Sequence, residues 1–216
     1  MSLVEEYALL PEEIDQESLR RVEASLPDSL SLSAGERYVV CRIVRAEGDP
    51  EIAGLVRFSS GAVLRGIAAL QTGAQVITDV RMVEVGISKA LLSSRKVSTR
   101  CAIDTREVAA RAQKEMTTRS IAAMRELAPH MDGALVVVGN APTALLAVLD
   151  LVNEGLAAPA LVIGMPVGFV ACAESKEALL VSSVPHICIR GYRGGSSAAA
   201  ATVNTLLSLA KEADAP

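Results

Sequence analysis

The sequence predicts one α/β domain of three layers, in which a mainly parallel β-sheet lies between two layers of helices. Short apolar runs alternate with helical patterns through the C-terminal half, as expected for successive β-α units. These runs are apolar throughout, which is typical of parallel strands covered on both faces. The chain has 216 residues, with no long linker or internal repeat. We therefore expect a single domain over residues 1–216 with a sizeable core.

The expected strands are short runs of β-branched and other aliphatic residues. The earliest of them, from Tyr38 to Val44, is rich in valine and isoleucine. Another short run ends at Asp79, and the last three runs are followed by glycine or arginine. We expect strands at residues 38–44, 75–77, 97–103, 134–138, 160–163 and 186–189.

The expected helices begin at capping residues or prolines and end near glycine or proline. The first follows Pro11 and carries its apolar residues near one face. Asp49 is a plausible N-cap, and Asp104 is expected to cap one long helix that Pro129 ends. We expect helices at residues 12–24, 50–58, 61–71, 104–127, 142–153, 174–180 and 196–211.

The composition restricts the class of function. Hydrophobic residues make up 50% of the chain but aromatic residues only 2%, which weakens any site that depends on aromatic stacking, such as single-stranded nucleic-acid binding. A net charge of −4 also argues against a nucleic-acid partner. Four scattered cysteines without a C-x-x-C pair favour buried thiols over a metal site. With no apolar run long enough to cross a membrane and no signal-peptide pattern, we expect a soluble cytoplasmic protein.

Three of the expected strands run directly into small residues that expose the backbone. These junctions are Gly139-Asn140-Ala141-Pro142, Gly164-Met165-Pro166 and Gly191-Tyr192-Arg193-Gly194-Gly195-Ser196. Ligand sites in open α/β sheets form where strand ends and helix N-termini meet. We therefore expect a binding site that is assembled from several loops of the C-terminal half.

Polar residues at or near these junctions have both a structural and a ligand-binding interpretation. Asn140 can lie near the cap of the next helix, or it can contact a ligand together with the neighbouring amides. Ser175 can cap its helix or donate outward. Lys176 stands in a first helical turn, where a cation is unfavourable, and a bound carboxylate would explain it.

Arg193 precedes two glycines and a helix that starts at Ser196. A guanidinium, a flexible backbone and a helix N-terminus together suit an anion, and a solvated arginine in a tight turn is the structural alternative. The sequence contains no complete phosphate-binding fingerprint. A nucleotide-binding enzyme of Rossmann type therefore rests on the glycine-rich turns alone.

Several motifs in a fixed order resemble one family. They are TDVRMV at 78–83, TRS at 118–120, GNAPTAL at 139–145, PVGFV at 166–170, ESK at 174–176 and the G-x-R-G-G-S turn at 191–196. In this combination the chain resembles the precorrin-8X methylmutases from about residue 7 to about residue 207. The resemblance implies the same fold class, with a mainly parallel sheet of about five strands, and a homodimer.

The resemblance also implies an activity. The family moves a methyl group from C-11 to C-12 of precorrin-8 or cobalt-precorrin-8, which gives hydrogenobyrinate or cobyrinate in corrinoid (vitamin B12) biosynthesis. The substrate is a large, partly apolar macrocycle that is edged with acetate and propionate side chains. The shift consumes no redox equivalent or nucleotide, so the resemblance implies an isomerase that needs no cofactor and no metal.

The resemblance assigns further residues to the substrate. The family's Thr-Arg-Ser motif contributes its arginine to substrate carboxylates, which gives that role to Arg119, although we expect this residue in the middle of a helix. Tyr7 and Ser18 fall where N-terminal residues of the family approach the macrocycle. The implied substrate-binding set is Tyr7, Ser18, Arg119, Asn140, Ser175, Lys176, Arg193 and Ser196.

One departure from the family concerns its catalytic histidine. The family has this histidine in a segment like Arg-x-x-His-Ala-x-Gly-Asp, and here the segment has Arg45 at that position. A guanidinium is effectively never deprotonated in proteins, so it is not an ordinary general acid. His130 and His186 are expected to be structural. Glu47 and Asp49 are alternative proton carriers near Arg45, and Asp49 is also the expected cap.

Three hypotheses follow for this chain. In the first, it is an active isomerase with a modified proton step, since its other motifs are intact. In the second, it is a paralogue that binds a corrinoid without isomerising it, as a carrier or release factor. In the third, it is an engineered variant whose histidine has been replaced by Arg45.

Overall fold

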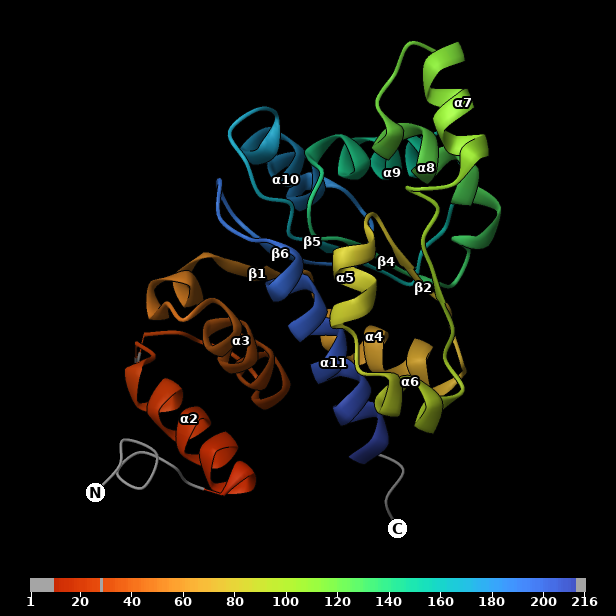
Figure 1. Cartoon of the computed structure of the whole chain (residues 1–216). Helices are drawn as coiled ribbons and strands as arrows, with labels where there is room; N and C mark the ends of the chain where they lie inside the picture. The colour runs from red at the N-terminus through yellow and green to blue at the C-terminus, as the bar shows by residue number, and fades with distance from the viewer. Residues whose placement is uncertain (1–9, 28, 213–216) are drawn as a thin grey trace, which may run out of the picture.

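The computed structural model describes residues 10–27 and 29–212, and within them six strands form one sheet (Figure 1). The strand order is β1-β6-β5-β4-β2-β3, in which β1 runs antiparallel to β6 and all other neighbours are parallel. The strands are β1 Val56–Phe58, β2 Val76–Thr78, β3 Thr99–Arg100, β4 Leu135–Val138, β5 Leu161–Gly164 and β6 His186–Ile189.

Helices cover both faces of this sheet. The α-helices are α2 Pro11–Ser25, α3 Ala34–Glu47, α4 Ala62–Gln71, α5 Arg81–Gly86, α6 Lys89–Arg95, α7 Arg106–Lys114, α8 Arg119–Leu127, α9 Pro142–Asn153, α10 Cys172–Val181 and α11 Ser196–Glu212. Short 3-10 helices lie at η1 Pro50–Leu55 and η2 Ala128–His130. One core contains residues of α3, α4, α5 and α11, and the other contains residues of α7 to α10.

The central strand β4 shows why these strands are apolar throughout. Leu135 and Val137 belong to the first core, whereas Val136 and Val138 belong to the second, and all four are fully buried. Successive side chains of a strand point to opposite faces, so a strand between two helical layers needs an apolar residue at every position. The predicted three-layer α/β architecture with a mainly parallel sheet is therefore confirmed.

The strand predicted at residues 38–44 is wrong, because these residues lie inside α3. The helix begins at Ser33, whose side chain accepts from the amide of Glu36 while the Glu36 carboxylate accepts from the amide of Ser33. It ends at Gly48, which adopts the left-handed conformation. The valines and isoleucine of the segment bury one side of the helix in the first core. Capping and burial thus outweigh the β-propensity of the segment.

The helix predicted at residues 50–58 is only partly correct. Asp49 caps η1, accepting a 2.9 Å hydrogen bond from the amide of Glu51, as expected. The chain then extends into β1, which pairs with β6 at the edge of the sheet. This antiparallel edge strand is one reason why the sheet has six strands rather than about five.

The long helix predicted at residues 104–127 is two helices. The chain reverses at Met116, whose φ is 49°, and Thr118 then caps α8 through a 3.2 Å hydrogen bond from the amide of Ile121. Thr105, rather than Asp104, caps α7. Arg119 is consequently the first residue of α8 and does not lie in the middle of a helix.

The remaining predictions in the C-terminal half agree closely with the structure. The helix predicted at 142–153 coincides with α9, the strand at 186–189 coincides with β6, and the helix at 196–211 differs from α11 by one residue. Because β2, β4, β5 and β6 are parallel, their carboxyl ends meet at one edge of the sheet. In the described part of the chain, no helix is long and apolar enough to cross a membrane.

Candidate functional site

Three loops at the carboxyl edge of the sheet form one connected surface. We call residues 139–141, 165–171 and 191–195 the edge loops. The amide of Val167 donates to Asn140 O over 3.4 Å, and the amide of Gly168 donates to Tyr192 O over 3.3 Å. The amide of Gly195 donates to Met165 O over 2.9 Å. The three glycine-rich junctions that the sequence singles out are therefore brought together.

Asp79 fixes the first edge loop and was missed as a site residue in the sequence. Its buried carboxylate accepts from the amides of Gly139, Asn140 and Ala141 at 3.0, 2.9 and 2.8 Å. Burial raises the pKa of Asp79, while the three amide hydrogen bonds act to lower it. These amides are expected to contact a ligand, but in the structure all three donate to Asp79. An aspartate directly after a buried strand was the available signal.

The first edge loop also packs closely against two helices. A Cβ on Gly139 would lie 2.6 Å from Val83 Cγ2 of α5 and 2.9 Å from Ala199 Cβ of α11. Because any larger residue would push these helices away, glycine is required here. The side chain of Asn140 is half-buried at this fixed position.

The expected contact of Lys176 with a substrate carboxylate, and of Ser175 with the substrate, does not fit the structure. Both residues are fully buried. The hydroxyl of Ser175 donates to Cys172 O at 2.9 Å. The ammonium of Lys176 donates to Gly191 O at 2.9 Å and to Arg193 O at 2.6 Å, so it binds the underside of the third edge loop. Burial lowers the pKa of Lys176.

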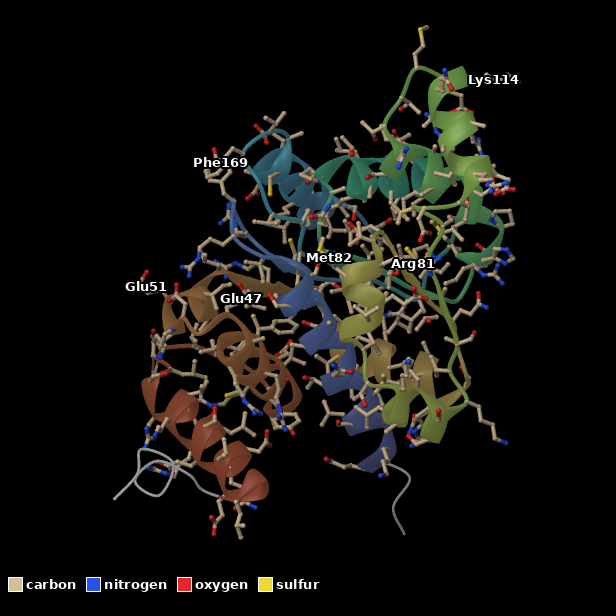
Figure 2. The ribbon with its side chains drawn as sticks, viewed as in Figure 1. Glu47, Glu51, Arg81, Met82, Lys114 and Phe169 are labelled. Atoms are coloured by element: carbon tan, nitrogen blue, oxygen red, sulfur yellow. The ribbon has the colours of Figure 1, made fainter. Side chains whose placement is uncertain are left out.

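Arg193 and Ser196 lie at the start of α11, as predicted. The guanidinium of Arg193 forms an ion pair with Asp49 and approaches Glu51 at 3.9 Å. Ser196 is the half-buried first residue of the helix. The next residue, Ser197, donates its hydroxyl to Glu47, so two contacts join this turn to the end of α3 and to η1. Figure 2 labels Glu47 and Glu51 on that side of the molecule.

Arg119 is exposed at the first turn of α8. The hydroxyl of Thr118 lies 3.3 Å from that of Thr143, so α8 begins beside the first turn of α9 and the Asn140 loop. Arg119 makes no ion pair with any residue in the described ranges. A cation at a helix N-terminus is unfavourable unless an anion is nearby. The position therefore suits an anionic ligand.

Arg45 lies in the last turn of α3, where its guanidinium pairs with Asp15 of α2. Arg42 approaches the same carboxylate at 3.4 Å. Burial acts to raise the pKa of Asp15, but the hydrogen bonds and charges of Arg45 and Arg42 outweigh it, so the pKa is lowered. In this structure Arg45 therefore helps to hold α2 on α3.

Two hollows flank Arg45. One, of about 300 Å³, is lined by both Ser18 and Arg45. The other, of about 380 Å³, runs between α3, α6 and α11, with Asn204 among its lining residues. Asn204 bridges α11 to the start of α6, donating to Gly86 O and accepting from the amide of Ser88. Ser18 and Arg45 thus share a hollow, whereas the other candidates gather at the edge loops. Tyr7 lies outside the described residues.

Neither histidine lines the hollows that flank Arg45. His186 is buried at the start of β6, with its Nδ1 2.9 Å from Val184 O. His130 is exposed in η2, which precedes β4 and therefore lies at the opposite edge of the sheet from the edge loops. The buried position of His186 agrees with its expected structural role, and the role of His130 stays a prediction. No cluster of metal-ligating residues is found in the described ranges.

An aromatic pair stands on the edge loops, where the composition gave little reason to expect stacking. Phe169 and Tyr192 have ring centroids 5.5 Å apart with an interplanar angle of 30°. Phe169 is 86% exposed and Tyr192 is 52% exposed. Met82, at the start of α5, is also exposed, and Figure 2 labels it together with Phe169. An exposed aromatic pair with Arg193 next to Tyr192 in the chain suits a large, partly apolar polycarboxylate.

Comparison with known proteins decides the family. The model of the precorrin-8X methylmutase family matches residues 13–209. The chain belongs to the precorrin-8X methylmutase family. A relative from Pseudomonas aeruginosa, named precorrin-8X methylmutase, is 40% identical over 188 residues, which cover 86% of this chain and 88% of that protein. A relative from Methanothermobacter thermautotrophicus, named cobalt-precorrin-8 methylmutase, is 41% identical over 185 residues, which cover 86% of each chain.

A solved structure of this family supports the fold. The crystal structure of the precorrin-8X methylmutase from Thermus thermophilus matches with a TM-score of 0.88 and 39% identity. The match covers 95% of this chain and 98% of the other. The chain therefore has the methylmutase fold over nearly its whole length, and the edge loops are part of that fold.

Proposed function

We propose that the protein is an isomerase of corrinoid biosynthesis, which moves a methyl group from C-11 to C-12 of precorrin-8 or cobalt-precorrin-8. Hydrogenobyrinate or cobyrinate would be the product. The observation that carries the proposal is the family match over residues 13–209, together with relatives named for both substrates. The edge loops, which hold Asn140 and Arg193, lie entirely within that match.

The edge loops and their surroundings suit the two parts of such a substrate. Arg119 and Arg193 supply guanidinium groups for its carboxylates, and Asn140 and Ser196 supply neutral hydrogen-bonding groups. The stacked aromatic side chains offer a flat apolar surface to the conjugated macrocycle. We also assign Ser18, which shares a hollow with Arg45, to the substrate, and Tyr7 on the family resemblance alone.

The role of Arg45 follows from the chemistry of its side chain. A methyl shift within one molecule is promoted when the macrocycle is held rigidly with the reacting carbons in place. A guanidinium can hydrogen-bond to the macrocycle or stabilise negative charge, but it does not release a proton. We therefore propose that Arg45 orients the substrate and that another group handles the proton.

Glu47 is our candidate for that group. Of the two carboxylates considered near Arg45, Asp49 caps η1 and pairs with Arg193. The carboxylate of Glu47 is held by the hydroxyl of Ser197 at the start of α11. A proton that Glu47 gives to a ring nitrogen and later takes back leaves the overall reaction balanced. Glu47→Gln should then lower the turnover rate and leave product affinity unchanged. An unchanged turnover rate would remove Glu47 from the mechanism.

A second function is favoured by the same departure at Arg45. Without the family's histidine, the chain could bind a corrinoid and release it unchanged, as a carrier. The experiment that separates the two functions measures product affinity and precorrin-8 turnover on the same preparation. Turnover supports the isomerase, whereas tight binding of hydrogenobyrinate without turnover supports the carrier.

We further propose that the protein works in the cytoplasm as a homodimer, without a cofactor. The dimer follows from the family resemblance. The exposed apolar residues of the edge loops are compatible with a neighbouring copy close to the substrate. Sedimentation equilibrium on the purified chain tests this, and a monomer at micromolar concentration would contradict it.

A further inference from the structure

Three successive carbonyls of the third edge loop accept hydrogen bonds from other parts of the protein. Gly191 O and Arg193 O both accept from the buried ammonium of Lys176, at 2.9 and 2.6 Å. Between them, Tyr192 O accepts from the amide of Gly168 at 3.3 Å. These contacts fix the direction of three consecutive peptide groups.

The opposite side of the same peptide groups carries their amides. No peptide bond in the described ranges is cis. In a trans peptide the C=O of one residue and the N–H of the next point in opposite directions. The amides of Tyr192 and Gly194 therefore face away from Lys176, and the amide of Arg193 faces away from the amide of Gly168. Across residues 10–27 and 29–212, none of the three donates to any acceptor.

The sequence of the loop enforces this arrangement. Gly194 has a φ of 140°, which only glycine adopts readily. A Cβ on it would lie 2.7 Å from Met165 O, so the loop sits directly on the second edge loop. Successive amides that point outward from such a turn form a concave site for an anion.

Lys176 places a positive charge behind the amides of Tyr192 and Gly194. It is fully buried, and no carboxylate pairs with it among the residues that the structure describes. Burying a cation without a counter-ion is costly, which a methionine of similar length would avoid. Its ammonium polarises the peptide groups whose oxygens it contacts, which makes the outward amides stronger donors. The guanidinium of Arg193 is paired with Asp49, so Lys176 supplies the charge at this point.

We infer that the amides of Tyr192, Arg193 and Gly194 bind one carboxylate side chain of the corrinoid. Lys176 is the positioning residue of this subsite and acts through the peptide groups rather than by contact. The inference rests on the proposed function, because it takes the ligand to be a corrinoid polycarboxylate. It also explains a buried lysine that makes no contact with the ligand.

The first test uses the unaltered full chain, labelled with ¹⁵N. Hydrogenobyrinate is titrated while the amide proton shifts are followed by NMR. Downfield shifts of the three amides are expected, because an N–H that donates to a carboxylate is deshielded. The same corrinoid with methyl-esterified carboxylates should not produce them. Binding of hydrogenobyrinate that leaves the three amides unmoved would overturn the inference.

The second test replaces Lys176 by methionine, with Lys211→Met at the exposed end of α11 as the matched control. Lys176→Met should weaken hydrogenobyrinate binding at least ten-fold, and Lys211→Met should leave the dissociation constant unchanged. The esterified corrinoid should bind Lys176→Met and the unaltered protein equally well. If Lys176→Met weakens both ligands equally, the lysine merely holds the loop and the inference is wrong. If Lys176→Met does not fold, the NMR titration decides alone.

The two tests also separate this inference from the proposed function. If the unaltered protein binds no corrinoid of any kind, the proposed function fails and takes the subsite with it. If it binds hydrogenobyrinate while the three amides and the Lys176→Met affinity do not change, the subsite alone is refuted.

Discussion

Replacing Gly194 by alanine tests whether the third edge loop lies directly on the second. Gly194 and Gly168 have the same φ of 140°, so the substitutions Gly194→Ala and Gly168→Ala impose a similar backbone strain. They differ in their surroundings. A Cβ on Gly194 would meet Met165 O at 2.7 Å and Pro166 O at 3.1 Å, whereas a Cβ on Gly168 meets nothing within 4 Å. Gly168→Ala is therefore a matched control.

The expected losses of stability have two contributions, the backbone strain and the contact of the new Cβ. A non-glycine residue held in such a conformation costs roughly 1–3 kcal/mol. The contact at Gly194 is with backbone oxygens, which cannot rotate away, so the loop itself must move, at about 1–3 kcal/mol more. Gly168→Ala should lower the free energy of unfolding by about 1–3 kcal/mol, and Gly194→Ala by about 2–6 kcal/mol.

Urea unfolding of both variants, followed by circular dichroism, measures the difference. The contact of the new Cβ with the backbone oxygens should appear as a larger loss of unfolding free energy for Gly194→Ala, at an unchanged m-value. Gly194→Ala should also weaken hydrogenobyrinate binding more than Gly168→Ala does, because it displaces the outward amides. Equal losses of stability in the two variants would refute the close approach of the loops.

Three further predictions concern single side chains. Asp79→Ala leaves three amides without an acceptor and should lower the free energy of unfolding in urea by roughly 3 kcal/mol or more. Asp150 is exposed on α9, so the control Asp150→Ala should change this free energy by less than about 0.5 kcal/mol. Arg119→Met should weaken hydrogenobyrinate binding about ten-fold, whereas Arg106→Met, exposed at the first residue of α7, should leave the affinity unchanged. Burial lowers the pKa of Lys176, so at alkaline pH below 10.5 the unfolded chain binds more protons than the folded chain. The stability of the unaltered protein relative to Lys176→Met should therefore increase as the pH rises toward 10.5.

For each of these three predictions, one experimental result would contradict it. Equal stability of Asp79→Ala and Asp150→Ala would mean that water replaces the carboxylate at no cost. Equal affinities of Arg119→Met and Arg106→Met would place Arg119 outside the site. A stability difference for Lys176→Met that does not change with pH would show that the lysine titrates alike in the folded and unfolded chains.

The repeated β-α pattern could be predicted from the sequence because its signals are local. Strand β4 is apolar at every position, and Pro142 is the first residue of α9, so both elements are marked by their own residues. Helix α3 was mistaken for a strand because its valines satisfy both patterns, and only its Ser33 cap and its final Gly48 separate the two. The break at Met116 carries no glycine or proline and could not be located in this way.

The candidate site could be predicted only in part, for a similar reason. The positions of Asn140 and Arg193 at strand ends follow from the order of the elements. The burial of Lys176 depends on carbonyls that are 15 and 17 residues further along the chain, and the role of Asp79 depends on amides about 60 residues away. Such contacts are set by tertiary packing, which no local pattern contains. The sequence motifs predict which loops form the site, but they do not show which atoms of those loops face the ligand.

The most direct test of the proposed activity is the turnover of precorrin-8, measured by visible absorption for the unaltered protein and for Arg45→His in parallel. We predict that the unaltered protein forms hydrogenobyrinate at a measurable rate, with Arg45 orienting the macrocycle while another group transfers the proton. Turnover by Arg45→His alone, with tight product binding by the unaltered protein, would contradict this and leave a corrinoid carrier on a methylmutase fold.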